Sequence, residues 1–175
     1  MIEVSIKQSI RDINDFPKPG IVFKDITPIL KDQKLCTEIV DAFIQKLDGL
    51  AFDAIAGIES RGFLFGLMLA NRLNKPFIPI RKSGKLPFRT IQQSYDLEYG
   101  SAVIEIHEDA FEPGAKILIH DDLLATGGTV EATSQLIQKM NGEIVGFSFI
   151  VSLDFLGGEE RLKKFSDKVF TLARY

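Results

Sequence analysis

The sequence has 175 residues, of which 45% are apolar and 26% charged, with a formal net charge of -3. This length is typical of one domain, the composition excludes a disordered chain, and the acidic balance argues against duplex nucleic acid as a partner. The single cysteine, Cys36, cannot form an internal disulfide, and we expect it to be a small buried residue of a helix. No apolar run approaches the ~18 residues needed to cross a bilayer, and the first residues do not resemble a signal peptide. We therefore expect a cytoplasmic protein with no membrane partner.

In chain order, the hydrophobic spacing predicts alternating helices and strands from residue 33 onward. The predicted helices span 33–50, 62–73, 130–140 and 159–164, and the predicted strands span 52–57, 77–80, 101–107, 116–119, 143–153 and 168–172. Strands that alternate with helices predict a parallel α/β sheet with right-handed crossovers. The strand at 101–107 alternates apolar and polar residues, so we expect Glu105 and His107 on an exposed face.

Residues 81–100 differ from the rest of the chain. They are rich in Lys, Arg, Gly, Ser and Gln, and the stretch is long for a connection between two strands. Arg81 and Lys85 form a local basic cluster within it. Because long loops in compact domains are commonly functional, we predict that this segment is a lid over a ligand site.

The strongest functional signal is the stretch ILIHDDLLATGGT at residues 117–129. A buried strand delivers two adjacent carboxylates, Asp121 and Asp122, to its carboxyl end, where ligands bind in open α/β sheets. The Gly-rich segment Ala125–Thr129 then leads into a helix, and its amides and hydroxyls suit a phosphate monoester. The spacing fits neither a Walker A loop nor a dinucleotide fingerprint. An isolated Asp-Asp pair would be a strand end beside a helix cap, but this context predicts a site where carboxylates hold ribose hydroxyls and the loop holds a phosphate.

This stretch resembles the phosphoribosyl diphosphate motif of the type I phosphoribosyltransferases, in the variant of the adenine-specific members. Four further segments resemble that family in the same order, at residues 16–28, 59–63, 81–87 and 94–100, and the resemblance covers about residues 12–160. It implies a Rossmann-like α/β core with a small N-terminal hood at about residues 1–30, in one domain over residues 1–175. It also implies transfer of a 5-phosphoribosyl group from 5-phospho-α-D-ribose 1-diphosphate to adenine, giving AMP and diphosphate. The implied cofactor is Mg²⁺, held mainly through substrate and water.

The resemblance further implies roles for individual residues. Asp121 and Asp122 would hold the ribose hydroxyls, and the 5-phosphate would lie against Ala125, Thr126, Gly127, Gly128 and Thr129. The diphosphate would meet Ser60, Arg61, Arg81, Lys82, Lys85 and Tyr99, with a cis peptide expected between Ser60 and Arg61. Adenine would lie between Phe23 and Leu153, read by backbone groups near Val22 and Lys24, while Glu98 would handle the proton at a purine nitrogen. Part of the lid would reach across the interface of a homodimer.

Several alternatives stay open at this point. Without the resemblance, Phe23 is a core side chain and Glu98 an exposed loop carboxylate. Ser83 and Phe88 stand where related proteins often carry other, sometimes basic, residues, which leaves the charge around the diphosphate undecided. His120 interrupts an apolar strand, and we expect a hydrogen-bonded structural histidine rather than a catalytic one. The competing functions are a phosphoribosyltransferase for a 6-oxopurine or orotate, and a non-catalytic regulator that senses the sugar diphosphate.

Overall fold

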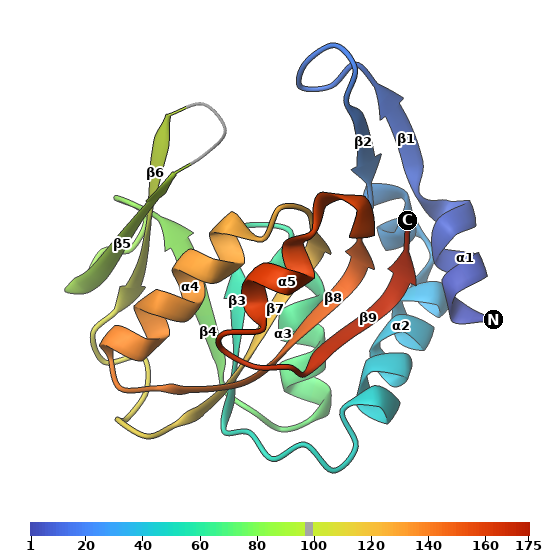
Figure 1. The fold of residues 1–175 in the computed structure, drawn as a ribbon. Helices are drawn as coiled ribbons and strands as arrows, with labels where there is room; N and C mark the ends of the chain where they lie inside the picture. Colours follow the sequence, from blue (N-terminus) through green and yellow to red (C-terminus); the bar gives the residue numbers. More distant parts are fainter. Residues whose placement is uncertain (97–99) are drawn as a thin grey trace.

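The computed structural model describes residues 1–96 and 100–175, which form a twisted sheet between two layers of helices (Figure 1). The strands of this sheet are β3 (Ala54–Ile58), β4 (Phe77–Lys82), β5 (Thr90–Asp96), β6 (Ser101–His107), β7 (Lys116–Leu124), β8 (Glu143–Ser152) and β9 (Val169–Arg174). The helices are α1 (Ile2–Ser9), α2 (Gln33–Lys46), α3 (Gly62–Arg72), α4 (Gly128–Lys139) and α5 (Gly158–Leu162), with the short 3-10 turns η1 (Thr27–Lys31) and η2 (Asp154–Leu156). The predicted α/β class is confirmed.

The strands lie in the order β5-β6-β4-β3-β7-β8-β9. The pairs from β4 to β9 are parallel, whereas β6 runs antiparallel to both β4 and β5. Parallel strands need crossover connections, and α3, α4 and α5 supply them. The sheet is therefore a doubly wound core with an antiparallel hairpin at one edge.

Side chains alternate between two hydrophobic cores along the central strand β7. Ile117 and Ile119 pack with α4 and α5 on one face, while Leu118 packs with α1, α2 and α3 on the other. This follows from the two-residue period of a strand, and it explains why both faces of the central strands are apolar. His120, the next residue, points toward α2 and α3.

The prediction that residues 81–100 form one continuous loop is wrong. β4 continues to Lys82, and residues 90–96 form β5, which pairs with β6 from Thr90 opposite His107 to Asp96 opposite Ser101. The hydrophobic pattern does not predict β5, because its sequence, TIQQSYD, is mostly polar and its side chains are only partly buried. The exposed face expected for β6 is also wrong, because the turn between β4 and β5 folds over it. The Lys85 and Leu86 amides bind Glu105, which is 2% exposed, and His107 is half-buried against Phe88.

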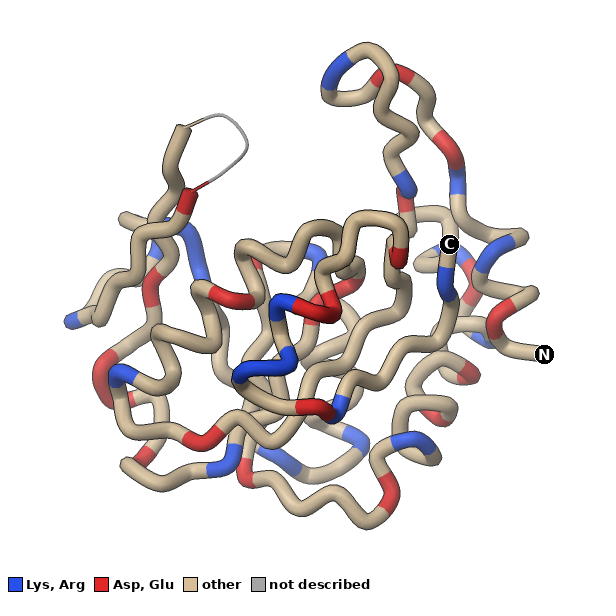
Figure 2. The backbone as a smooth tube through the Cα atoms, in the orientation of Figure 1, with Lys and Arg blue, Asp and Glu red and all other residues tan. Residues whose placement is uncertain are grey.

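The N-terminal hood contains a hairpin of β1 (Arg11–Asn14) and β2 (Val22–Asp25) that stands away from the main sheet (Figure 1). The Asp15 carboxylate accepts a hydrogen bond from the Gly20 amide at 2.7 Å and closes the connection between these strands. The hood hairpin and the β5–β6 hairpin rise from the same end of the sheet. Figure 2 shows Lys and Arg interspersed with Asp and Glu along the described backbone. Within the described ranges, no helix is both long and apolar enough to span a membrane.

Candidate active site

The acidic pair lies where β7 runs on beyond its neighbour β3. The last β3–β7 partners are Gly57 and His120, so Asp121 and Asp122 extend past this pairing and lie beside the 59–62 turn. A Cβ on Gly62 would come within 2.8 Å of the Asp121 Oδ1 atom. A residue without a side chain is therefore required at the start of α3, because the acidic pair approaches its backbone so closely.

Arg61 and burial together set the charge of this pair. Asp122 is buried, and its Oδ2 atom lies 3.1 Å from Arg61 Nε. Burial and the adjacent Asp122 carboxylate raise the pKa of Asp121 well above its usual range. The pKa of Asp122 is also raised, because burial outweighs the attraction of the Arg61 guanidinium. Hydroxyl donors or a further cation would stabilise the doubly ionised pair, which is what a ribose diol accompanied by a cation provides.

The loop between β7 and α4 is built for close approach of its backbone. Gly127 has a left-handed φ of 79°, and a Cβ there would lie 2.9 Å from the Gly158 carbonyl oxygen. In return, a Cβ on Gly158 would lie 2.2 Å from the Ala125 carbonyl oxygen. The first turn of α4 has no capping side chain among the described residues. Its free amides and the partial positive charge of the helix end therefore suit a phosphate, and this loop with the start of α4 is called the phosphate cradle below.

A cluster of cationic side chains lies on the turn between β4 and β5. Arg81 Nε and the Lys82 amide both donate to Glu59 Oε2 at 3.0 Å, and Arg81 Nη1 donates to the Lys85 carbonyl oxygen at 3.2 Å. The Lys82 and Lys85 side chains are exposed, and no ion pair joins either to a carboxylate of the described residues. The turn thus holds its backbone through Glu59 while two ammonium groups remain available.

Glu105 holds the other side of this turn. Its carboxylate accepts hydrogen bonds from the Lys85 amide at 2.8 Å and the Leu86 amide at 2.9 Å. The Gln92 side chain donates at 3.1 Å and the Thr90 hydroxyl at 3.4 Å. Burial acts to raise the pKa of Glu105, but these amides and that of Gly84 outweigh it and lower the pKa. An ionised carboxylate under the turn therefore fixes the backbone of Lys85.

Three of the four predicted base-binding residues, Val22, Phe23 and Lys24, lie on β2 of the hood. Val22 is 46% exposed, and the Phe23 ring packs edge-on against Phe16 with ring centroids 5.2 Å apart. The Arg61 guanidinium lies 4.9 Å from the centroid of the Phe23 ring. Because Arg61 also binds Asp122, one side chain spans from the acidic pair to the aromatic ring. The hood and the carboxyl end of β7 therefore border one site.

His120 is structural in its surroundings. The ring is fully buried, its Nδ1 lies 2.9 Å from the Ser148 hydroxyl, and it packs edge-on against Phe43. Gly66 of α3 leaves room for it, since a Cβ there would lie 3.2 Å from the ring. Burial lowers the pKa of His120 to about 3, so the ring is neutral at physiological pH. A hydrogen-bonded histidine was expected here.

The structure thus brings most of the predicted site residues together. Arg61 joins Phe23 to Asp122, Glu59 joins Arg81 to Lys82, and the Thr129 hydroxyl donates to the Tyr95 hydroxyl at 3.3 Å. Ser60 is exposed on the turn before α3, and Thr126 is exposed on the phosphate loop. Leu153 is 9% exposed after β8, and its amide donates to the Leu124 carbonyl. Glu98 and Tyr99 lie outside the described residues.

One predicted detail is wrong, and some supporting residues were missed. The cis peptide joins Glu59 to Ser60, not Ser60 to Arg61, so it lies one bond closer to the end of β3. Glu59 was given no role because an isolated acid at a strand end carries no signal. Glu105 was missed because its position in the alternating pattern indicated an exposed face. The turn between β4 and β5, which covers Glu105, is not visible in that pattern.

Three comparisons with known proteins agree with this geometry. The family described as the phosphoribosyl transferase domain matches residues 25–172. The adenine phosphoribosyltransferase of Cytophaga hutchinsonii is 53% identical over 100% of this chain and 97% of its own length. The adenine phosphoribosyltransferase of Acidobacterium capsulatum is 52% identical over 97% of this chain and 93% of its own length.

Solved structures show the same similarity. The crystal structure of adenine phosphoribosyltransferase from Thermoanaerobacter pseudethanolicus has a TM-score of 0.95 and 45% identity, covering 100% of both chains. The Saccharomyces cerevisiae enzyme, crystallised with adenine and an imino-altritol bisphosphate, has a TM-score of 0.90 and 36% identity, covering 98% of both chains. The fold is therefore that of these proteins.

Proposed function

The chain belongs to the phosphoribosyl transferase family, and we propose how its residues transfer a phosphoribosyl group to adenine. The reaction forms a bond between C1 of the ribose and a nitrogen of adenine, and breaks the bond between C1 and the diphosphate oxygen. The products are AMP and diphosphate, and the proton on the attacking nitrogen is released. The observation that carries the proposal is the reach of Arg61, which lies against both Phe23 and Asp122.

The sugar phosphate is proposed to bind along the end of β7. Asp121 and Asp122 would accept hydrogen bonds from the two ribose hydroxyls, and the 5-phosphate would occupy the cradle of Ala125–Thr129. The support is the position of the pair beyond β3 and the uncapped N-terminus of α4. These contacts would hold C1 of the ribose between the hood and the β4–β5 turn. Adenine would then attack C1 from the side of the hood, and the diphosphate would leave toward the β4–β5 turn.

The diphosphate is proposed to bind the 59–62 turn together with the β4–β5 turn. Ser60, Arg61, Arg81, Lys82 and Lys85 are the groups assigned to it here, with Tyr99 as a further one outside the described residues. The reaction has strong oxocarbenium character, so the main electrostatic task is to neutralise the departing diphosphate. The two exposed ammonium groups beside Arg81 support this assignment.

Adenine is proposed to stack between Phe23 and Leu153 while backbone groups of Val22 and Lys24 bind its edge. Glu98 is proposed to take the proton that leaves the purine as the glycosidic bond forms. Glu98→Gln keeps shape and polarity but cannot accept a proton at neutral pH. We expect turnover to fall about 10²–10⁴-fold with a much smaller change in the Kd of adenine.

Magnesium belongs to this proposal as the cofactor. In the part of the chain that the structure describes, no three His, Cys, Asp or Glu side chains are grouped to hold a metal ion. Mg²⁺ would be held mainly through substrate oxygens and water, with the carboxylates of Asp121 and Asp122 nearby as hard oxygen donors of the kind that it prefers. When bound, the ion supplies charge neutralisation at the diphosphate.

A homodimer and a cytoplasmic location complete the proposal. Leu64, Leu67 and Met68 expose an apolar stripe on α3, and a surface hollow of about 470 Å³ adjoins it between α2 and α3. The residues that line this hollow include Arg72 but no carboxylate, unlike the end of β7, so we assign it to subunit contact rather than to substrate. The single buried thiol of Cys36 supports a reducing compartment.

The test separates the two halves of the site. AMP formation is measured at varied adenine and varied phosphoribosyl diphosphate, for wild type, Phe23→Ala and the Asp121→Asn, Asp122→Asn double variant. We expect Phe23→Ala to raise KM mainly for adenine and the double variant mainly for the sugar diphosphate. Equal effects of both variants on both substrates would contradict the assignment.

A further inference from the structure

Tyr175, which follows β9, binds both neighbours of Leu153 through its backbone. Its amide donates to the Ser152 carbonyl at 2.9 Å, and its carbonyl accepts from the Asp154 amide at 2.9 Å. The Leu153 amide donates to the Leu124 carbonyl at 2.9 Å. The backbone of Leu153 is therefore fixed on each side, and Tyr175 supplies the attachment on the side away from β7.

The ring of Tyr175 contacts the residue that follows Phe23. The Lys24 ammonium lies 4.2 Å from the ring centroid and 2.7 Å from the Asp12 carboxylate. Since the Lys24 side chain is only 13% exposed, its cation–π contact is shielded from water and is stronger than an exposed one. Lys7 of α1 places a second ammonium 5.1 Å from the same ring. The ring thus holds β2, the strand that carries Phe23.

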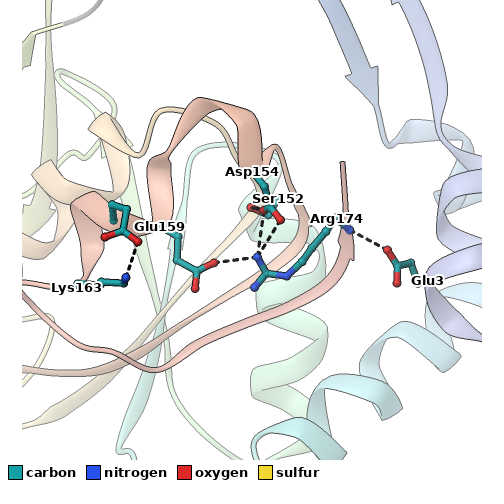
Figure 3. Close-up of polar contacts among 7 residues, drawn as sticks. Glu3, Ser152, Asp154, Glu159, Lys163 and Arg174 are labelled. Carbon is teal, nitrogen blue, oxygen red and sulfur yellow. Dashed lines mark hydrogen bonds and ion pairs between the residues drawn. The ribbon is translucent and has the colours of Figure 1, made fainter.

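Arg174 ties the same region to α1 and to the segment after β8 (Figure 3). Its Nη1 atom donates to both oxygens of Asp154, at 3.1 and 3.3 Å, and to Glu159 at 2.9 Å. Its backbone amide donates to the Glu3 carboxylate at 3.2 Å. The residues around Tyr175 are therefore held in place. As a result, Tyr175 can fix the positions of the two segments that it contacts, β2 and the residues around Leu153.

We propose that Tyr175 is a positioning residue for adenine, which sets the separation between Phe23 and Leu153. The inference rests on the proposed adenine pocket, because Phe23 and Leu153 are its two walls. A flat base gains most from stacking when both walls meet it at contact distance. A gap of only about 0.5–1 Å forfeits a quarter to a half of each dispersion contact. Tyr175 reaches one wall through its ring and Lys24, and the other through its backbone.

The experiment compares two ligands that share the sugar phosphate, AMP and ribose 5-phosphate, by equilibrium binding to the full-length protein. Tyr175→Ala removes the ring but keeps both backbone hydrogen bonds, and Tyr175→Phe keeps the ring. We expect Tyr175→Ala to weaken AMP binding about 3- to 10-fold with ribose 5-phosphate unchanged, and Tyr175→Phe to match wild type for both ligands. Lys75→Met, which removes another cation–ring contact at 5.5 Å from the Phe52 ring, is the matched control and should leave both affinities unchanged.

A double-mutant cycle tests the route through Lys24. If the ring acts on Phe23 by holding Lys24, Tyr175→Ala should add little to the loss of AMP affinity already caused by Lys24→Met. Full additivity of the two changes would overturn this route. A parallel loss of AMP and ribose 5-phosphate affinity, or a Tyr175→Phe defect equal to that of Tyr175→Ala, would also overturn the positioning role.

Phe23→Ala, measured in the same way, separates this inference from the pocket on which it rests. If Phe23→Ala weakens AMP binding while Tyr175→Ala has no effect, the positioning role is overturned and the adenine pocket stands. If neither variant changes AMP affinity, the pocket itself is refuted together with the inference.

Discussion

Replacing Glu105 with Gln tests how the β4–β5 turn is held for the diphosphate. The carboxylate accepts hydrogen bonds from Lys85 and Leu86 at 2.8 and 2.9 Å, and from Gln92 and Thr90 at 3.1 and 3.4 Å. Gln keeps the shape but has one acceptor oxygen and no charge. A hydrogen bond to a charged group is worth about 1 kcal/mol more than a neutral one, so the two shortest bonds account for about 2 kcal/mol. This corresponds to about a 30-fold change in a binding constant.

The assay is steady-state kinetics with both substrates varied. We expect Glu105→Gln to raise KM for phosphoribosyl diphosphate about 10- to 30-fold, with KM for adenine changed less than about 2-fold. Glu108→Gln is the matched control, because Glu108 follows the same strand and pairs with Arg89 at 3.6 Å in an exposed position. The reasoning is refuted if the two variants have the same KM for the sugar diphosphate, or if Glu105→Gln raises both KM values equally.

The pH dependence of stability gives a second measurement on the same variant. A carboxyl group whose pKa is lowered by folding stabilises the protein above its unfolded pKa of about 4.3, and this contribution is lost as the pH falls through the folded-state pKa. The stability deficit of Glu105→Gln should therefore be largest at neutral pH and shrink below about pH 4. Thermal unfolding at several pH values measures it, and a deficit independent of pH would contradict an ionised Glu105.

Three further changes test other parts of the site. Gly158→Ala places a methyl group 2.2 Å from a carbonyl oxygen of the phosphate loop and should raise KM for the sugar diphosphate about 10- to 100-fold. Gly157→Ala is its control, because the added methyl group would meet nothing within 4 Å and the variant costs only the ~1 kcal/mol of a left-handed φ. Equal kinetic defects in the two variants would contradict the proposed phosphate cradle. Because His120 has a pKa of about 3 in the folded protein, its contribution to the free energy of unfolding of wild type should fall by about 1 kcal/mol between pH 6.5 and 5.5. If the free energy of unfolding of His120→Asn had the same pH dependence as that of wild type, this prediction would be refuted. Asp121→Asn removes a proposed partner of a ribose hydroxyl, so turnover should fall about 100-fold or more. The melting temperature should not fall, because burial raises the pKa of this carboxylate and its ionised form therefore does not stabilise the fold. Near-wild-type turnover would remove Asp121 from the mechanism.

Local patterns predicted the core of the fold and singled out the segment that we propose binds the sugar phosphate. The apolar runs at β3, β7 and β8 are long enough to identify buried strands, and the segment from Asp121 to Thr129 combines acids, glycines and a helix start within a few residues. A site whose residues lie next to one another in the chain can therefore be found from the sequence. The element order and the parallel arrangement follow from the alternation of strands and helices.

The supporting contacts could not be predicted because they join distant segments. Glu105 is buried because the turn between β4 and β5 folds over it and side chains of β5 bind its carboxylate, and the mostly polar sequence of β5 did not indicate a strand there. The ring of Tyr175 meets Lys24 across almost the whole length of the chain. Hydrophobic periodicity describes which face of an element is buried, but it does not identify the partner that covers the face.

The central claim is transfer to adenine in particular, and the specificity constants for adenine and hypoxanthine test it most directly. Both bases are assayed with phosphoribosyl diphosphate and Mg²⁺, and formation of nucleotide and of diphosphate is followed together. A 6-oxo base inverts the donor and acceptor pattern that the backbone of Val22–Lys24 is proposed to bind. A site built on such hydrogen bonds rejects the mismatched base by about 10⁴–10⁵ in kcat/KM, with one diphosphate released for each AMP formed. Comparable kcat/KM values for the two bases would contradict the account.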